Sequence, residues 1–448
     1  MAEISGWLLP ATEVGRKRPG TAARRWVDAA GLWCTLGYAA LAWLARQPGE
    51  PGLPEFFLLI AWTGLPVFGV FLYLRRGDEP FPLGRLLLWA AAFRLCGLIG
   101  GPIFEDDFYR YLWDGYRFAT SGTPYGSAPD AFFVDPQVPA AFQAVLNRIN
   151  NPELPTIYAP TTQLVFLLSH WVQPASVAAL QSILILFDLA TIALLLRLAP
   201  ARNVMLYAWC PLVVKEIAFT AHPDGIGVCL LLAAIVLARA GHWRSTAICL
   251  GLATAAKVFA LILAPLVLVR ARFRYWALFG ITTTAMYAPF ALSGGTDLES
   301  LGIFAREWEF NSAVFGLVTT VLERSYVVVG LGVIFATFWL FYAAQYVKNA
   351  AGGVPRGDWI YGVFLVVSPV INPWYLLWVL PFAAITPSAW AWTASLAVLL
   401  SYVTGINLNA PDLQSYQQPL WVRLLEFGLI LAALGFDLVR RRRSTPSG

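Results

Sequence analysis

Three consecutive carboxylates, Glu105, Asp106 and Asp107, begin where a long apolar stretch of the chain ends. Charged side chains are costly to hold at the boundary of a bilayer. Such a run is therefore either a solvated group at the level of the lipid headgroups or a functional site. Carboxylates can take the proton of an acceptor hydroxyl, so the run is a candidate catalytic site.

The residues after this run have the spacing of an amphipathic helix over residues 108–120. One face of that helix would carry Asp107, Arg110, Asp114 and Arg117. The other face would carry Phe108, Tyr111, Leu112, Gly115, Phe118 and Ala119. We expect this helix to lie flat on a membrane, with its apolar side among acyl chains, its charged side in water, and the carboxylates at its N-terminus stabilised by the helix dipole. The alternative is a surface helix whose charges only neutralise one another.

Further polar segments interrupt the later apolar runs. They are Lys215-Glu216, His222-Pro223-Asp224, Lys257 and Asn372-Pro373-Trp374-Tyr375. Lysine can neutralise a phosphate, so these residues together with the acidic run suit transfer of a group from a lipid phosphate to an alcohol. Each has a structural alternative: Lys257 could snorkel or pair with Asp224 or Glu216, Lys215 and Glu216 could form a local pair, and Asp224 could cap the following helix.

Composition places the chain in a membrane. Hydrophobic residues make up 58% of the 448 residues and charged residues only 13%, which excludes an ordinary soluble globular protein. The 19 Trp, 17 Tyr and 29 Phe suit interfacial belts and a pocket for a ring-shaped or chain-like ligand. The five cysteines lie inside apolar runs at irregular spacing, which indicates buried thiols, and no histidine has a Cys or Glu at zinc-ligand spacing. We therefore predict neither redox chemistry nor a metal site.

The net charge of +5 is concentrated in short basic groups beside apolar spans, at residues 16–18, 24–25 and 440–443. The positive-inside rule then places both termini in the cytoplasm, with basic tails over 1–25 and 440–448. Because these groups accompany no binding domain, we expect no nucleic-acid partner. The apolar run from Trp26 to Leu44 is long enough for a retained first helix, with a cleaved leader as the alternative.

The spacing of apolar runs predicts an all-α integral membrane protein that forms one domain over residues 1–448, with about 12 to 14 membrane helices. Three spans precede a long extracytoplasmic loop over 101–175, which is rich in turn signals and should carry interfacial helices. Residues 161–172 are expected to form a helix packed over the outer face, with a full span as the alternative. The later polar segments should reach this same face.

Two short helices, 245–256 and 258–269, are expected on either side of Lys257. Each is shorter than a relaxed span, and such broken helices are tolerated around a cavity. A single continuous helix is the competing interpretation, and it would put Arg270 on the wrong side of the membrane. Counting spans therefore favours the two-helix hairpin.

Several motifs match a known pattern. They are Glu105-Asp106-Asp107-Phe108-Tyr109-Arg110-Tyr111-Leu112-Trp113-Asp114-Gly115, Gly122-Thr123-Pro124-Tyr125 and Tyr158-Ala159-Pro160, with weaker matches at Asn150 to Tyr158, Lys215-Glu216, His222-Pro223-Asp224, Ala256-Lys257-Val258-Phe259 and Asn372 to Trp378. Together they resemble the polyprenol-phosphate-sugar-dependent glycosyltransferases of the GT-C fold, and most closely the bacterial mannosyltransferase-like branch. In those families an acidic pair opens the first outer loop, a Gly-x-x-Pro-Tyr element follows, and a Tyr-x-Pro turn leads back to the membrane.

This resemblance implies a GT-C-like helical bundle and an inverting hexosyltransferase. It would move a hexose, with mannose as the expected sugar, from a polyprenyl phosphate to a glycan or glycolipid acceptor. Transfer would take place on the outer face of the cytoplasmic membrane. The general base would be Asp106 or Asp107, and the resemblance does not choose between them. Metal is usually dispensable in this group, so no cofactor is expected to be required, although a divalent metal is compatible with the acidic pair.

The donor phosphate would be bound by Arg110, Lys215 or Lys257, and the sugar or isoprenoid by Tyr158 and Trp374. The other candidate substrate-binding residues are Tyr111, Asp114, Tyr125, Glu216, His222, Asp224, Asn372 and Tyr375. A transporter or flippase of lipid-linked sugars is the main alternative, and it would predict inverted repeats and charges near the bilayer midplane, which the sequence does not display. A non-catalytic partner in a glycan-synthesis complex is a further alternative. No feature of the sequence indicates an oligomeric state.

Overall fold

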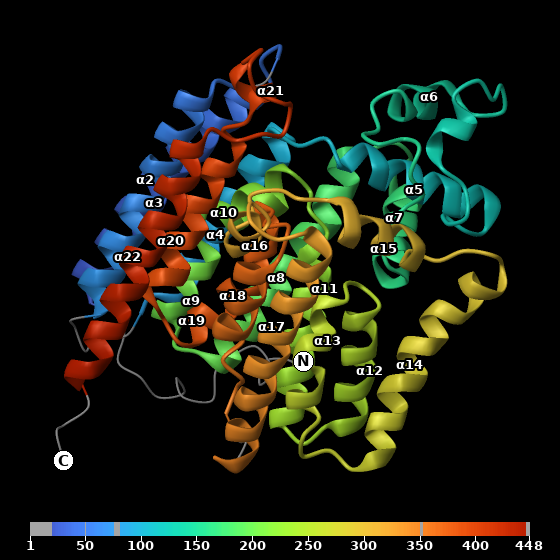
Figure 1. Ribbon diagram of the computed structural model, residues 1–448. Coiled ribbons are helices and arrows are strands. Elements are labelled where there is room, and N and C mark those ends of the chain that lie inside the picture. Colours follow the sequence, from blue (N-terminus) through green and yellow to red (C-terminus); the bar gives the residue numbers. More distant parts are fainter. Residues whose placement is uncertain (1–19, 50, 76–80, 350–352, 445–448) are drawn as a thin grey trace, which may run out of the picture.

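The computed structural model describes residues 20–49, 51–75, 81–349 and 353–444, and within them it is built of helices (Figure 1). These residues form no strand, only one isolated bridge between Phe310 and Val370. The predicted all-α membrane fold is confirmed. Most of the predicted basic tail over 1–25, and the end of the tail over 440–448, lie outside the described residues.

Among the described residues, five helices are long and apolar enough to cross a membrane. They are α2 (Thr21–Ala45), α3 (Leu53–Arg75), α4 (Leu83–Gly100), α8 (Val177–Leu198) and α17 (Arg324–Lys348). A sixth passage is broken: Pro211–Phe219 and Asp224–Arg239 meet at 116°. The chain is thus a multi-pass membrane protein, whereas the count of about 12 to 14 spans stays a prediction.

Further helices complete the bundle and run beside these (Figure 1). They are α9 (Ala201–Ala208), α10 (Pro211–Val213), the π-helix η2 (Val214–Phe219), α11 (Asp224–Arg239), α12 (Trp243–Thr254), α13 (Phe259–Val267), α14 (Phe273–Leu292), α18 (Gly357–Val367), η3 (Pro373–Trp378), α19 (Leu380–Ile385), α20 (Ala389–Ala397), η4 (Val398–Tyr402) and α22 (Leu420–Ser444). The break between α12 and α13 contains Lys257, so the predicted two-helix hairpin is confirmed. Pro373 at the start of η3 likewise interrupts the helix, with Asn372 as the residue before it.

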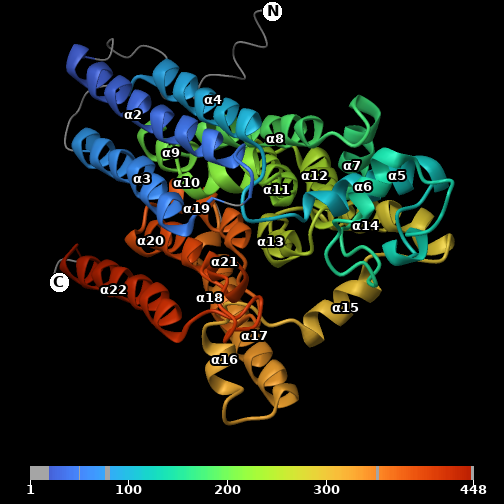
Figure 2. The ribbon, with the colours of Figure 1, turned by 90° about the horizontal axis from the view of Figure 1, so that it is seen from above.

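The remaining helices lie mostly in the upper half of Figure 1, with α6 and α21 at the top and α15 and α16 near mid-height. They are α5 (Phe108–Ser121), η1 (Pro129–Phe132), α6 (Ala140–Leu146), α7 (Pro160–Val172), α15 (Leu298–Glu307), α16 (Val314–Val318) and α21 (Gly405–Leu408). Seen from above, α2 to α4 lie on one side of the molecule, α5 to α7 on the other, and α16 and α17 project from a third side (Figure 2). The 13 residues of α7 are too few for a relaxed span, and α7 packs against α5.

The amphipathic helix is confirmed as α5, but its predicted faces are partly wrong. Its apolar side does not lie open to acyl chains: Tyr111 and Leu112 are buried, and Tyr111 stacks on Phe166 of α7. A Cβ on Gly115 would come within 2.5 Å of the Phe166 carbonyl oxygen, so only glycine permits this close approach. Asp114, expected to face water, is only 2% exposed because the returning loop covers it.

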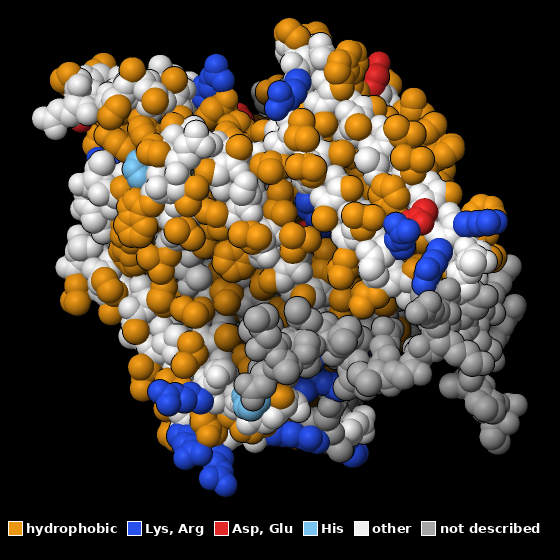
Figure 3. Space-filling view, turned by 180° about the vertical axis from the view of Figure 1, so that it is seen from behind, with side chains coloured by type: hydrophobic (Ala, Val, Ile, Leu, Met, Phe, Trp, Pro, Cys, Tyr) orange, Lys and Arg blue, Asp and Glu red, His pale blue; other side chains and the backbone are white. Residues whose placement is uncertain are grey.

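The outer surface agrees with a membrane environment. Hydrophobic side chains spread over much of the face opposite that of Figure 1, while Lys and Arg side chains gather mainly near its lower edge and at one side (Figure 3). In the most apolar 18-residue stretch of α17, only 11% is buried inside the molecule. Most of the valine, isoleucine and phenylalanine side chains of this helix therefore point outward. Such a helix gains stability from lipid contact rather than from the protein core.

Candidate active site

A cavity of about 820 Å³ lies where the polar segments converge. The predicted site residues that line it are Asp107, Arg110, Tyr158, Asp224, Lys257, Asn372, Trp374 and Tyr375. They come from the first loop, the start of α11, the α12–α13 turn and η3, which are far apart in the sequence. The predicted convergence of these segments is therefore present in the structure.

The two candidate bases occupy different positions. Asp107 precedes the first residue of α5, is 32% exposed on its side chain, and lines the cavity. The hydroxyl groups of Tyr111 and Tyr158 both lie 3.5 Å from its Oδ2 atom. Asp106 accepts a hydrogen bond from the side-chain amide of Asn150 and is not among the cavity-lining residues. The geometry therefore favours Asp107 over Asp106 for contact with a substrate.

Lys215 and Glu216 form a buried pair beneath the cavity. Both side chains are fully buried, with Lys215 Nζ 3.2 Å from Glu216 Oε1, and the Tyr402 hydroxyl donates to the same oxygen at 3.0 Å. Lys215 also donates to the Tyr402 hydroxyl. Neither Lys215 nor Glu216 lines the cavity. The structure thus displays the local pair that the sequence left open, and it places Lys215 out of direct reach of a phosphate in the cavity.

His222 connects this pair to Asp107. Its Nδ1 atom lies 3.0 Å from Glu216 Oε2, its Nε2 atom lies 3.9 Å from Asp107 Oδ2, and its ring stacks on Trp374 at 3.8 Å between centroids. Ala221 just before it has φ +62°, a conformation that costs a non-glycine residue about 1 kcal/mol or more. That strained residue turns the chain after η2 and directs His222 toward Asp107.

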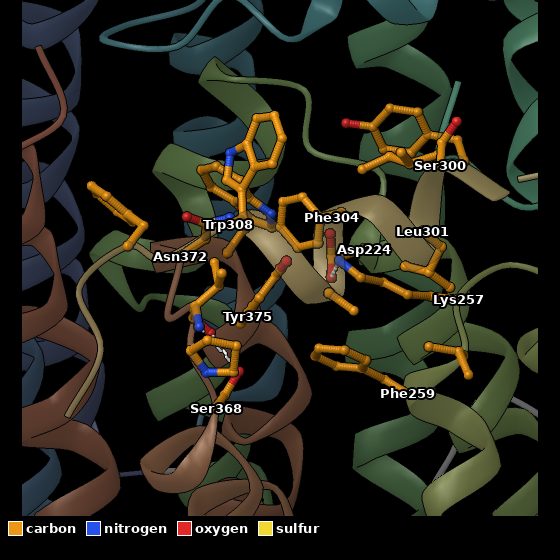
Figure 4. Close-up of a pocket in the computed structure, with 18 of the residues that line it drawn as sticks. Asp224, Lys257, Phe259, Ser300, Leu301, Phe304, Trp308, Ser368, Asn372 and Tyr375 are labelled. Carbon is orange, nitrogen blue, oxygen red and sulfur yellow. Dashed lines mark hydrogen bonds and ion pairs between the residues drawn. The ribbon is translucent and has the colours of Figure 1, made fainter. Parts of the chain in front are cut away.

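Lys257 lies at the cavity wall in a close ion pair with Asp224. Its Nζ atom is 2.6 Å from Asp224 Oδ1, which also accepts a hydrogen bond from the Trp378 indole at 2.7 Å. Asp224 is only 2% exposed, whereas 25% of the Lys257 side chain remains exposed. In Figure 4, Lys257 and Tyr375 both point toward the centre of the pocket, and Lys257 Nζ lies 4.4 Å from the Tyr375 ring centre. Lys257 therefore has its structural partner and still faces the cavity.

Arg110 and Tyr125 hold the first loop in place. The guanidinium of Arg110 donates to the carbonyl oxygens of Leu154 and Asn151, each at 2.9 Å, and the Tyr125 hydroxyl donates to the Tyr158 carbonyl oxygen at 2.8 Å. Arg110 lines the cavity, but Tyr125 does not. Both residues position the segment that carries Tyr158.

Asp114 belongs to the same framework rather than to the cavity wall. Its Oδ2 atom accepts hydrogen bonds from Thr156 and from Gln163, at 2.5 and 2.9 Å. Burial raises the pKa of Asp114 to about 6, although the positive charge of Arg110 and the two hydrogen bonds lower it. The carboxylate therefore costs stability when it is ionised.

This cost predicts a pH-dependent effect of Asp114→Asn. Between about pH 4 and 6 the folded protein holds a proton that the unfolded chain has released, so stability falls as the pH rises through this window. Asp114→Asn removes the titration and should stabilise the protein at pH 7.5 by up to about 3 kcal/mol, with a gain that shrinks toward pH 4. Thermal unfolding in detergent across this range would measure the gain. The matched control is Asp130→Asn, which changes an exposed carboxylate of the same loop. Equal melting temperatures of Asp114→Asn and the wild type at pH 7.5 would contradict the prediction.

Glu105 also lines the cavity, although only Asp106 and Asp107 of the acidic run were predicted as general bases. Burial raises the pKa of Glu105 well above its usual range; Lys215 opposes this rise, and the neighbouring Asp107 and Glu216 add to it. A carboxylate oxygen of Glu105, one of Asp107 and a ring nitrogen of His222 all lie within 4.8 Å of one another. These three atoms are of the types that bind metal ions.

Sequence reasoning also missed a wall of the cavity. No helix was predicted over 293–311, yet this segment contains α15, from which Ser300, Leu301 and Phe304 line the cavity, followed by Trp308 (Figure 4). The spacing of Phe304 and Trp308 at i and i+4 was the available signal for this helix. Tyr402 gave no such signal because only tertiary contacts bring it to Glu216.

The described helices and this cavity define a polytopic helical membrane protein with a mixed polar and apolar pocket at one end. The chain belongs to the alpha-(1->6)-mannopyranosyltransferase family, whose N-terminal domain matches residues 38–272, slightly more than half of the chain. This is a GT-C-type mannosyltransferase family, so the resemblance drawn from the motifs is confirmed and the chain is a glycosyltransferase. No curated protein and no solved structure matches the chain.

Proposed function

We propose that the chain is an inverting glycosyltransferase that moves a hexose, with mannose as the expected sugar, from a polyprenyl phosphate to a glycan or glycolipid acceptor. Transfer would take place on the extracytoplasmic face of the cytoplasmic membrane. The lipid-linked donor, the acceptor and the bilayer would be its partners. Family membership supports glycosyl transfer, and the form of the cavity supports the lipid-linked donor.

One observation carries the choice of donor: the cavity lining combines charged residues with an apolar wall. Asp107, Asp224 and Lys257 line its polar part. Its apolar part is lined by Val328, Leu331 and Phe335 of α17 and by Phe364 and Val367 of α18. Because α17 is also largely exposed at the surface of the bundle, an isoprenoid chain could pass from the cavity into the bilayer. A water-soluble sugar nucleotide has no apolar chain that could contact this wall.

The reaction can be assigned to the charged residues of the cavity lining. Asp107 would take the proton of the acceptor hydroxyl while the acceptor oxygen forms a bond to C1 of the sugar. The bond between C1 and the phosphate oxygen breaks, and its electron pair stays on the phosphate. Lys257 would stabilise the charge that grows on the departing polyprenyl phosphate. Attack from the side opposite the phosphate inverts the configuration at C1.

The test is release of polyprenyl phosphate by the purified full-length protein. Polyprenyl-phosphate hexoses that differ in the sugar would be supplied with mixed glycan and glycolipid acceptors, and both products would be quantified. We expect release with one hexose, mannose first, in step with glycosylation of an acceptor. The matched control donor is the same hexose phosphate without the isoprenoid chain, which should be a poor substrate. Equal use of the two donors, or transfer from a nucleotide sugar alone, would overturn the proposal.

The membrane orientation gives a separate prediction. In a cysteine-free background, Ser127→Cys in the first loop should react with an impermeant thiol reagent added to intact cells, whereas Ser245→Cys near the start of α12 should not. Both serines are exposed, Ser127 in the loop after α5 and Ser245 in the first turn of α12, so they form a matched pair. Permeabilised cells should label both. Labelling of Ser245→Cys alone in intact cells would invert the orientation and place the cavity on the cytoplasmic side.

A further inference from the structure

Three side chains from two distant segments bring metal-ligand atoms to one point of the cavity. Glu105 and Asp107 contribute carboxylate oxygens from the start of the first loop, and His222 contributes a ring nitrogen from the turn before α11. Both carboxylates line the cavity, so an ion held by them would be accessible to a substrate. His222 adds a buried imidazole to these two carboxylates, which distinguishes the site from a cluster of acidic residues alone.

The Nε2 atom of His222 is a buried polar atom without a hydrogen-bond partner among the described residues. The side chain is only 1% exposed, and Nε2 points at Asp107 Oδ2 from 3.9 Å. That separation is too long for a hydrogen bond. Two ligands of a zinc-sized cation, each about 2.1 Å from it, lie about 3 to 3.5 Å apart, so a small movement would let both atoms bind one ion. A cation between them would satisfy an atom that otherwise bears a desolvation cost.

The other ring nitrogen is held as metal-bound histidines require. Nδ1 lies 3.0 Å from Glu216 Oε2, and Glu216 is itself held by Lys215 and Tyr402. A hydrogen bond from Nδ1–H to this carboxylate fixes the tautomer in which Nε2 carries its lone pair toward Asp107. Carboxylate, histidine and metal form such a chain in many proteins, and the outer carboxylate orients the ring and raises its basicity. The buried Lys215–Glu216 pair thereby gains a positioning role.

We propose that Glu105, Asp107 and His222 bind one divalent transition-metal ion, of the kind represented by Mn²⁺ or Zn²⁺, at the cavity wall that carries the two carboxylates. One imidazole and two carboxylates suit such ions better than Mg²⁺ or Ca²⁺, which prefer oxygen ligands. Three protein ligands leave a position open toward the cavity for an oxygen of the donor phosphate. Asp107 would bind through Oδ2, the oxygen that faces His222, and keep Oδ1 for the acceptor proton.

This inference deepens the proposed function because it names what would neutralise the donor phosphate beside Lys257. It also revises the expectation from the motifs that no metal is needed. A protonated His222 that forms ion pairs with Glu216 and Asp107 is the competing explanation of the same geometry. The two explanations differ in whether the protein binds a metal ion when no substrate is present.

The experiment measures Mn²⁺ binding to the purified, metal-stripped, full-length protein without donor or acceptor. Loss of the free Mn²⁺ signal in electron paramagnetic resonance gives stoichiometry and affinity, and added Zn²⁺ tests competition. We expect one Mn²⁺ per chain, displaced by Zn²⁺ more readily than by Mg²⁺. Glu105→Gln and His222→Gln should each weaken binding by at least tenfold, and Glu216→Gln by about 10- to 100-fold through loss of the orienting carboxylate.

Matched controls are Glu299→Gln on the exposed face of α15 and His242→Gln at the exposed residue just before α12, both of which should bind Mn²⁺ as the wild type does. Glu105 is partly exposed, so Glu105→Gln keeps the test valid even where His222→Gln folds poorly. Absence of Mn²⁺ and Zn²⁺ binding to the wild type, or unchanged binding to Glu105→Gln, would overturn the metal site. Because no substrate is present, this result is independent of whether the donor assignment is right.

Discussion

Asp107→Asn should reduce sugar transfer by about two to four orders of magnitude, the range expected when a general base is lost. The substitution keeps the size of the side chain and removes its ability to take a proton. Asp107 is the member of the acidic pair that lines the cavity, and its exposed fraction of 32% leaves room for an acceptor. Turnover of lipid-linked donor by purified protein of confirmed folding is the measurement.

Asp106→Asn is the matched control, since it makes the same change one residue away. Asp106 does not line the cavity and accepts a hydrogen bond from Asn150, so this variant should keep transfer within about tenfold of the wild type. Saturating Mn²⁺ separates the two roles of Asp107: transfer that returns with excess metal would mean that Asp107 acts only as a ligand. Near-normal turnover of Asp107→Asn without added metal would show that the base lies elsewhere, and Asp224 would then be the next candidate.

The long helices and α5 could be predicted from the sequence, because their formation depends on residues close together in the chain. Apolar runs separated by basic turns located the long helices, because burial in lipid and the positive-inside rule act on each segment separately. Counting spans also predicted the break at Lys257 between α12 and α13. Helical spacing predicted α5 to within one residue of its C-terminal end at Ser121.

Residues whose surroundings come from distant segments could not be predicted in the same way. Asp114 has the spacing of a water-facing residue, yet Thr156 and Gln163 return from later in the chain to bury it. Lys215 has the charge of a phosphate ligand, but Tyr402 and Glu216 hold it beneath the cavity. Sequence spacing gives the face of a helix and leaves open what packs against that face.

The candidate metal ligands could not be predicted either, because they come from segments that are far apart in the sequence. Zinc-site patterns are recognised when ligands recur at short intervals in the chain. Here Glu105 and Asp107 meet His222 only because the bent passage through η2 and α11 returns to the first loop. The signal for His222 was its place next to Pro223 and Asp224, which identified a polar turn without identifying its partner.

Lys257→Met should lower turnover and donor affinity by about 3 kcal/mol combined, or roughly a hundredfold, if Lys257 contacts the donor phosphate. Methionine keeps the length of the side chain and removes its charge, so the stabilisation of the departing phosphate is lost. Lys257→Arg should recover only part of the activity because a planar guanidinium does not reproduce a compact ammonium charge. Initial rates over a range of donor concentrations would separate the effect on turnover from the effect on affinity.

Lys257→Met also removes the ion-pair partner of Asp224, whose side chain is only 2% exposed. An unpaired buried carboxylate should cost about 3 to 5 kcal/mol in stability. Asp224→Asn removes that unpaired charge, so the double variant Lys257→Met/Asp224→Asn should regain folded yield and melting temperature. The single variant Asp224→Asn keeps Lys257 and serves as the matched control. If Lys257 binds the phosphate, the double variant should fold well and still transfer sugar roughly a hundredfold more slowly than Asp224→Asn. Equal transfer by the double variant and Asp224→Asn would assign Lys257 a purely structural role and leave the phosphate to Arg110 and the proposed metal ion.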